Sequence, residues 1–150
     1  MKAAIAQIDT SALRHNLAVV KRHAPSCKII AVVKANAYGH GLLPVARTLV
    51  DADAYAVARI EEALMLRSCA VVKPIVLLEG FFSSADLPVL AANNLQTAVH
   101  TWEQLEALEQ AELPAPVVAW FKLDTGMHRL GVRAEDLGDG FARLGRSRDV

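Results

Sequence analysis

Hydrophobic residues along the chain fall into two alternating patterns: short apolar runs, and stretches with an apolar residue every three or four positions. The first pattern predicts strands and the second predicts amphipathic helices. The predicted strands are residues 29–33, 54–58, 75–78, 95–99 and 117–123, after an initial extended piece at 2–8. The predicted helices run from the capping residues 9–11 to Pro25, and over 42–49, 60–69, 83–92, 101–109 and 134–144.

Capping residues support several of these helices. Asp9 and Thr101 have side chains that accept hydrogen bonds from the first free N–H groups of a helix, and Gln104 completes a Thr-x-x-Gln capping pattern. Glu61 and Glu62 fall in the first turn of the helix at 60–69, where the helix dipole favours carboxylates.

The strand–helix alternation repeats five times, which is typical of parallel strands joined by crossover helices and so predicts an α/β fold. A doubly wound sheet and a (β/α)8 barrel both fit this rhythm. A glycine-rich turn normally follows the first strand of a doubly wound fold, and no GxGxxG follows any strand here. The sequence therefore favours a barrel. Five units do not close one, since barrels need roughly 250 residues, so we predict a partial (β/α)8 TIM-type barrel.

The composition argues against several classes of function. The 150 residues include 16 basic and 16 acidic side chains, and only 5% are aromatic, which argues against nucleic acid as a partner. No signal peptide and no apolar run long enough for a membrane span is visible. Cys27 and Cys69 form no metal-ligand pattern, and no metal site is predicted. We expect both to be partly buried, reduced thiols in a cytoplasmic protein.

Lys34 is the first residue with candidate chemistry. It ends the apolar run IIAVVK, where a strand buried on both faces would hardly tolerate an ammonium without a use for it. At the carboxyl end of a barrel strand, a desolvated lysine is nucleophilic toward aldehydes such as that of pyridoxal phosphate. Tyr38, in the loop that follows, could donate to a phosphate oxygen, and Gly39 and Gly41 permit tight turns there. The alternative is a lysine that keeps its ammonium in water.

A second candidate segment, FKLDTGMHRLG, follows the fifth predicted strand. Lys122 ends that strand and Arg129 lies in the loop after it, so the two cations suit an anionic ligand at a barrel mouth. An Asp124–Arg129 pair that merely closes a turn is the alternative. We expect His128 to be a solvated loop residue rather than a general base.

His100 and Glu79, which end the fourth and third predicted strands, are weaker candidates for the same mouth.

These two segments also carry a family resemblance. AVVKANAYGHG, residues 31–41, resembles the pyridoxal-phosphate attachment motif of alanine racemases, and KLDTGMHRLG, residues 122–131, resembles the second signature of that family. LLEGFF and TAVH between them also resemble family sequence, so the resemblance covers essentially the whole chain.

The resemblance implies a role for each matching residue. Lys34 matches the lysine that binds pyridoxal phosphate covalently and acts as acid or base on the D-alanine face. Tyr38 matches the tyrosine that binds the cofactor phosphate. Arg129 matches the arginine near the phenolic oxygen of the cofactor, which helps to hold the substrate carboxylate. Lys122 matches a lysine that is carbamylated in many members and orients that arginine.

The resemblance further implies a homodimeric enzyme that interconverts L- and D-alanine and supplies D-alanine for peptidoglycan. Family members have a complete barrel followed by a β domain, with the second catalytic group, a tyrosine, donated by the partner subunit. We therefore expect residues 1–150 to be the N-terminal part of the barrel domain and to lack activity alone. The remaining alternatives are a barrel decarboxylase of basic amino acids and an inactive structural fragment.

Overall fold

The computed structural model describes residues 4–147 and Val150, and its centre is a five-stranded parallel sheet. The strands are β1 (Ile30–Val32), β2 (Ala54–Val57), β3 (Ile75–Leu77), β4 (Gln96–Val99) and β5 (Ala119–Phe121). Their spatial order follows the chain, β1-β2-β3-β4-β5, and in the registers Ala31 lies opposite Tyr55 and Ala98 opposite Trp120. In a doubly wound sheet the order would reverse at a switch point. The predicted partial barrel is therefore confirmed.

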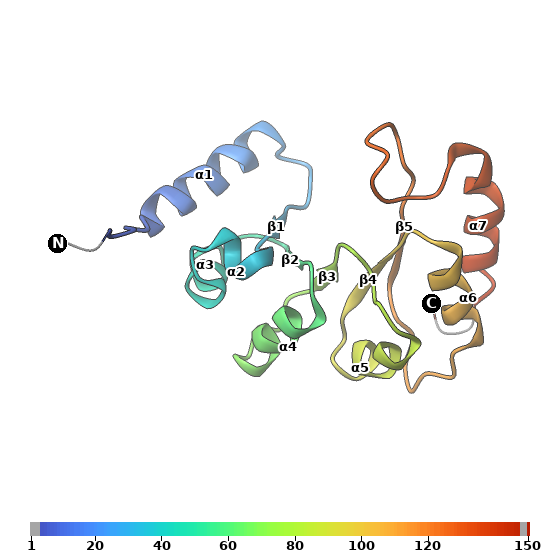
Figure 1. The fold of residues 1–150 in the computed structure, drawn as a ribbon. Coiled ribbons are helices and arrows are strands. Elements are labelled where there is room, and N and C mark those ends of the chain that lie inside the picture. Colours follow the sequence, from blue (N-terminus) through green and yellow to red (C-terminus); the bar gives the residue numbers. More distant parts are fainter. Residues whose placement is uncertain (1–3, 148–149) are drawn as a thin grey trace.

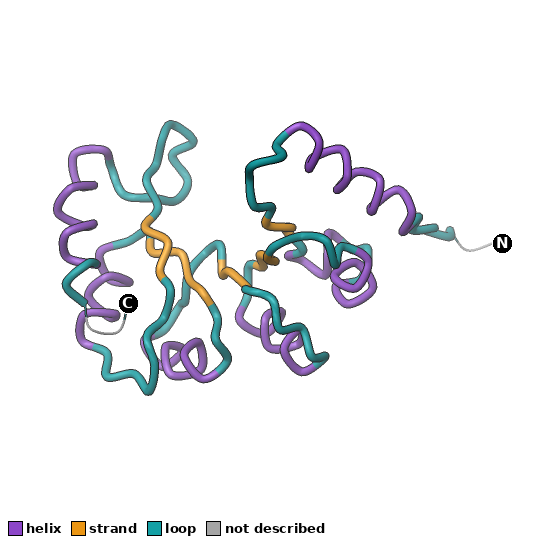
Figure 2. The backbone as a smooth tube through the Cα atoms, turned by 180° about the vertical axis from the view of Figure 1, so that it is seen from behind, coloured by secondary structure: helices purple, strands orange, loops and turns teal. Residues whose placement is uncertain are grey.

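The helices lie around the outside of the curved row of strands (Figure 1 and Figure 2). They are α1 (Thr10–His23), α2 (Lys34–Tyr38), α3 (Leu42–Thr48), α4 (Ile60–Ser68), α5 (Leu87–Ala92) after the short turn η1 (Ser84–Asp86), α6 (Trp102–Gln110), and α7 (Leu137–Leu144) after η2 (Ala134–Asp136). The predicted caps are present: the Asp9 carboxylate accepts from the N–H of Ser11 at 2.8 Å, and Thr101 Oγ1 from that of Gln104 at 3.2 Å.

The hydrophobic core lies between the strands and the helices. Alternate strand residues such as Tyr55, Val57, Leu77 and Val99 point outward and are buried against the helices. From the helices, the largest fully buried contributions are leucines, among them Leu66, Leu87, Leu90, Leu105 and Leu108. The core thus fixes the strand ends relative to one another, and with them the side chains that follow each strand.

The opposite face of the sheet is open at its edge strands, which contradicts the expectation that the first strand is buried on both faces. Ile30 and Val32 in β1 are 38% and 42% exposed, and Trp120 in β5 is 50% exposed. These side chains alternate with the buried ones and point toward the inside of the barrel wall. No second layer covers that face within residues 4–147, so the apolar inner residues of the edge strands meet solvent.

Residues 4–8 of the piece that we expect to be extended pair with no strand in the described part of the chain, and Ile5 is exposed; residues 2 and 3 lie outside the described residues. One further expectation is wrong. Cys27 is exposed rather than partly buried, whereas Cys69 is half-buried. Among the described helices, none has the length and apolar character needed to cross a membrane.

Candidate active site

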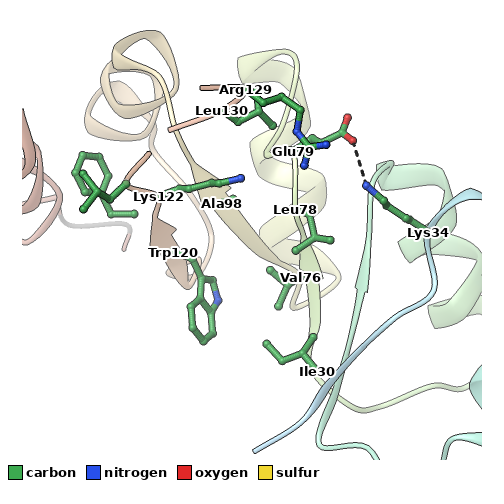
Figure 3. A pocket seen from close by; sticks show the side chains of 12 residues that line it. Ile30, Lys34, Val76, Leu78, Glu79, Ala98, Trp120, Lys122, Arg129 and Leu130 are labelled. Carbon is green, nitrogen blue, oxygen red and sulfur yellow. Dashed lines mark ion pairs between the residues drawn. The ribbon is translucent and has the colours of Figure 1, made fainter. Parts of the chain in front are cut away.

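Lys34 lies at the carboxyl end of β1, as predicted, and its side chain is 29% exposed at the rim of a cavity of about 680 Å³. The preceding residue, Val33, is fully buried and donates its N–H to the carbonyl of Ala56 at 2.8 Å. The lysine therefore leaves a fixed strand end, and its stem and ammonium are directed to the inner side of the barrel wall (Figure 3).

The segment after Lys34 was expected to be a loop, but it is a short left-handed helical turn. Ala35, Asn36, Ala37 and Tyr38 have φ values of 52°, 54°, 52° and 55°. Each such residue costs about 1–2 kcal/mol relative to a right-handed conformation, so tertiary contacts must hold the turn in place. Propensity could not predict it, because none of the four is glycine.

Hydrogen bonds within the segment close this turn. Ala37 donates its N–H to the carbonyl of Val33 at 2.8 Å, and the side-chain oxygen of Asn36 accepts from the N–H of Leu42 at 2.8 Å. Tyr38 follows at the end of the turn, is 60% exposed, and is not among the residues that line the cavity. The structure thus does not bring Tyr38 into the cavity with Lys34.

Glu79 is the carboxylate nearest to Lys34. Its Oε1 lies 4.0 Å from Lys34 Nζ, and its side chain is 39% exposed. The Glu79 carbonyl accepts from His100 Nε2 at 2.9 Å and from Gln104 Nε2 at 3.3 Å, so His100 carries its proton on Nε2 in this contact. His100 therefore supports the backbone of Glu79, and Glu79 faces the cavity.

Gln104 has a different role from the one that its capping pattern predicted. Thr101 accepts from the Gln104 N–H, as expected, but the Gln104 side chain turns inward and is buried. Its amide donates to the carbonyl of Phe81 at 3.0 Å and accepts from the N–H of His100 at 3.0 Å. Gln104 thereby joins the chain segments that follow β3 and β4.

Lys122 and Arg129 both line the same cavity as Lys34, reaching it from the β5 side (Figure 3). Lys122 donates its N–H to the carbonyl of Val99 at 2.8 Å. Its own carbonyl accepts from the N–H of Val132 at 2.9 Å, which closes the loop that carries Arg129. Lys122 and Arg129 therefore line the same cavity as Lys34, because the carboxyl ends of parallel strands lie on the same side of the sheet.

Asp124 organises this loop through His128 rather than through the expected alternative, Arg129. One oxygen accepts the N–H groups of Gly126 and His128, at 2.9 and 3.0 Å, and the other lies 3.0 Å from His128 Nδ1. The two backbone N–H groups and the His128 ring lower the pKa of Asp124 to about 2. His128 is 83% exposed, so it is a solvated loop residue as predicted.

The cavity joins an apolar floor to a charged mouth. Leu78 and Trp120 are among the apolar residues of the floor, and the charged lining residues are Lys34, Glu79, Lys122 and Arg129. Three cations against one carboxylate favour an anionic ligand, and the floor suits a flat apolar ring. Sequence analysis missed Leu78 and Trp120, although the alternation along β3 and β5 predicts which of their residues face inward.

Comparisons with known proteins indicate one family. The family model described as alanine racemase, N-terminal domain, matches residues 8–150. A curated alanine racemase of Aeromonas hydrophila is 87% identical over all 150 residues, which span 42% of that relative. A biosynthetic alanine racemase structure from Pseudomonas aeruginosa is 44% identical with a TM-score of 0.90, covering 95% of this chain and 40% of that one. An alanine racemase structure from Bacillus anthracis, described with bound L-Ala-P, is 30% identical with a TM-score of 0.78, covering 95% and 39%.

The similarity extends along nearly the entire chain, whereas the chain spans less than half the length of these relatives. The family model matches residues 8–150, and the solved structures contain the same partial barrel. The sequence and the fold thus indicate the same family. The chain therefore belongs to the alanine racemase N-terminal domain family.

Proposed function

We propose that the protein to which this chain belongs is an alanine racemase that interconverts L- and D-alanine and supplies D-alanine for peptidoglycan. The observation that carries the proposal is a cavity lined by Lys34, Lys122 and Arg129, in a chain of this family. The crystallised relative with bound L-Ala-P supports alanine as the substrate class.

We also propose that residues 1–150 are the N-terminal part of a barrel domain, with the remaining barrel strands and a β domain elsewhere in the protein. Two observations support this: the chain spans 42% of the Aeromonas hydrophila relative, and the inner face of its sheet is open at the edge strands. The remaining strands would cover Ile30, Val32 and Trp120.

The residues at the cavity fit pyridoxal phosphate by the chemistry of their donors. Lys34 offers an amine, Arg129 and Lys122 offer cations for anionic oxygens, and Leu78 and Trp120 offer an apolar surface for the ring. Tyr38, which is exposed at the end of the turn after Lys34, would donate a hydrogen bond from its hydroxyl to the phosphate. When bound, the cofactor would supply an aldehyde that condenses with the Lys34 amine, releasing one water, and a ring that accepts the electron pair left by loss of an α-proton.

Each residue would then have a defined task. Lys34 would remove or return the proton at the α-carbon on one face of the amino acid, at a point where its stem is held by the fixed end of β1. Arg129 would hold the substrate carboxylate and lie near the phenolic oxygen of the cofactor. A proton donor on the opposite face would come from a second copy of the complete protein, so we propose a homodimer, located in the cytoplasm.

Lys122 would be carbamylated in this scheme. Its amine would add to carbon dioxide and lose one proton, and the resulting anion would accept from Arg129 instead of repelling it. Both side chains line one cavity, which supports the pairing. In protein prepared with ¹³C-bicarbonate, we expect a carbamate carbon signal that disappears in Lys122→Arg; a spectrum without that signal would refute the modification.

The decisive experiment combines labelling with assays on the full-length protein. After incubation with pyridoxal phosphate and reduction with borohydride, peptide mapping is expected to find the label on Lys34, and the untreated protein is expected to racemise both enantiomers of alanine. Label on Lys122 or Lys28 would overturn the assignment. Release of carbon dioxide from basic amino acids without racemisation would favour the decarboxylase, and neither activity would favour a structural role.

A further inference from the structure

Glu62 connects the turn that carries Lys34 to the neighbouring strand. Its Oε1 accepts from the N–H of Asn36 at 3.1 Å, and its Oε2 accepts from the N–H groups of Ala58 and Arg59, at 3.1 and 3.3 Å. Asn36 lies in the left-handed turn after β1, whereas Ala58 and Arg59 follow β2 and precede α4. One carboxylate therefore joins two adjacent strand ends at the mouth of the barrel.

The other hydrogen bonds of residues 35–38 are local. Ala37 bonds to Val33 and the Asn36 side chain bonds to Leu42, all within the segment after β1. Such bonds fix the shape of the turn. Ala37 is buried in the core, so it fixes how far the turn lies from the surface. The bond from Asn36 to Glu62 joins the turn to α4. It adds a second link, beyond the bond from Val33 to Ala56 that ties the end of β1 to β2.

A simpler explanation is that Glu62 only caps α4. Glutamate at the third helical position commonly accepts from the N–H of the residue before the helix, as it does here with Arg59. Glutamine serves the same capping purpose, because one oxygen is sufficient. Glutamine cannot, however, present acceptors on both sides, because its second terminal atom is an N–H₂ donor.

We propose that Glu62 is a positioning residue, which holds the left-handed turn so that Lys34 and Tyr38 are directed to the same bound ligand. The inference rests on the proposed function for the identity of that ligand, pyridoxal phosphate. Lys34 opens the turn and Tyr38 ends it, so a turn that is free to reorient would misplace both groups together.

The test compares Glu62→Gln with Glu61→Gln in the full-length protein. Glu61 is a matched control, since it is the preceding residue in the first turn of α4, carries the same charge and has its exposed carboxylate 3.5 Å from Arg59. Without cofactor, we expect Glu62→Gln to raise the amide exchange rate of the peptide containing residues 34–38 by about 10-fold or more, and Glu61→Gln to leave it unchanged.

Cofactor binding gives a second readout. We expect Glu62→Gln to raise the dissociation constant of pyridoxal phosphate by about 10-fold and to alter the visible circular dichroism of the bound cofactor, with Glu61→Gln at wild-type values. A Glu62→Gln protein with wild-type exchange and cofactor binding would overturn the inference, as would equal losses in both variants. If Glu62→Gln does not fold, Glu62→Asp, which keeps the charge but is too short to bridge both sides, is expected to show the same exchange increase.

The two proposals fail separately. A wild-type protein that does not bind pyridoxal phosphate at Lys34 contradicts the proposed function, whereas the amide exchange of the cofactor-free variants still decides whether Glu62 holds the turn.

Discussion

Replacing Lys34 by alanine in the full-length protein is expected to lower kcat for alanine racemisation by about three orders of magnitude and to abolish borohydride labelling. The side chain lines the cavity from a fixed strand end, and in the proposed mechanism it serves both as the point of covalent attachment and as a proton-transfer group. Loss of one positioned proton-transfer group alone typically costs about 10²–10⁴-fold in rate. Steady-state kinetics in both directions and peptide mapping measure the two effects.

Lys28→Ala is the matched control, because Lys28 is an exposed lysine just before β1 and thus at the opposite end of the same strand. It is expected to keep wild-type kinetics and labelling. Lys34→Ala leaves a space where the lysine side chain was, so added methylamine should enter that space and restore part of the activity. Full activity of Lys34→Ala without any added amine would show that the lysine takes no part in the reaction.

Gly80→Ala is expected to destabilise the protein by about 4 kcal/mol or more, measured as the free energy of unfolding in urea. Gly80 has a φ of +74°, and a Cβ placed there would lie 2.3 Å from Gln104 Nε2 and 2.6 Å from the carbonyl oxygen of Ala98. The Gln104 amide is buried and cannot withdraw without losing its bonds to Phe81 and His100. The Glu79–Gly80 turn beside Lys34 would shift with it.

Gly39→Ala separates the steric effect from the backbone effect. Gly39 has a similar φ of +84°, but a Cβ there would meet nothing within 4 Å. This variant is expected to lose about 1–2 kcal/mol, the cost of a left-handed conformation alone. Equal losses in the two variants would mean that the contact with Gln104 contributes little.

Much of the fold was predictable because the signals for it are local. Asp9 and Thr101 cap the helices that they were expected to cap, and the five predicted strands all form, each of them shorter than expected. The position of Lys34 at a strand end also followed from the pattern. The pattern was misleading for the inner face of β1, because burial depends on what lies opposite a strand and not on its own residues.

The contacts of the candidate site were decided by the tertiary structure. Glu79 beside Lys34 and Glu62 on the N–H of Asn36 join residues far apart in the chain. The choice of His128 over Arg129 as the partner of Asp124 depends on the conformation of a closed loop.

The sequence by itself thus determined which segments are strands and helices, that the strands are parallel, and which cations stand at their carboxyl ends. The tertiary structure decided the left-handed turn after Lys34, in which Ala35, Asn36, Ala37 and Tyr38 adopt a conformation that local preference disfavours. The physical reason is that local preferences amount to about 1 kcal/mol per residue, whereas a buried contact with a distant residue can outweigh several of them.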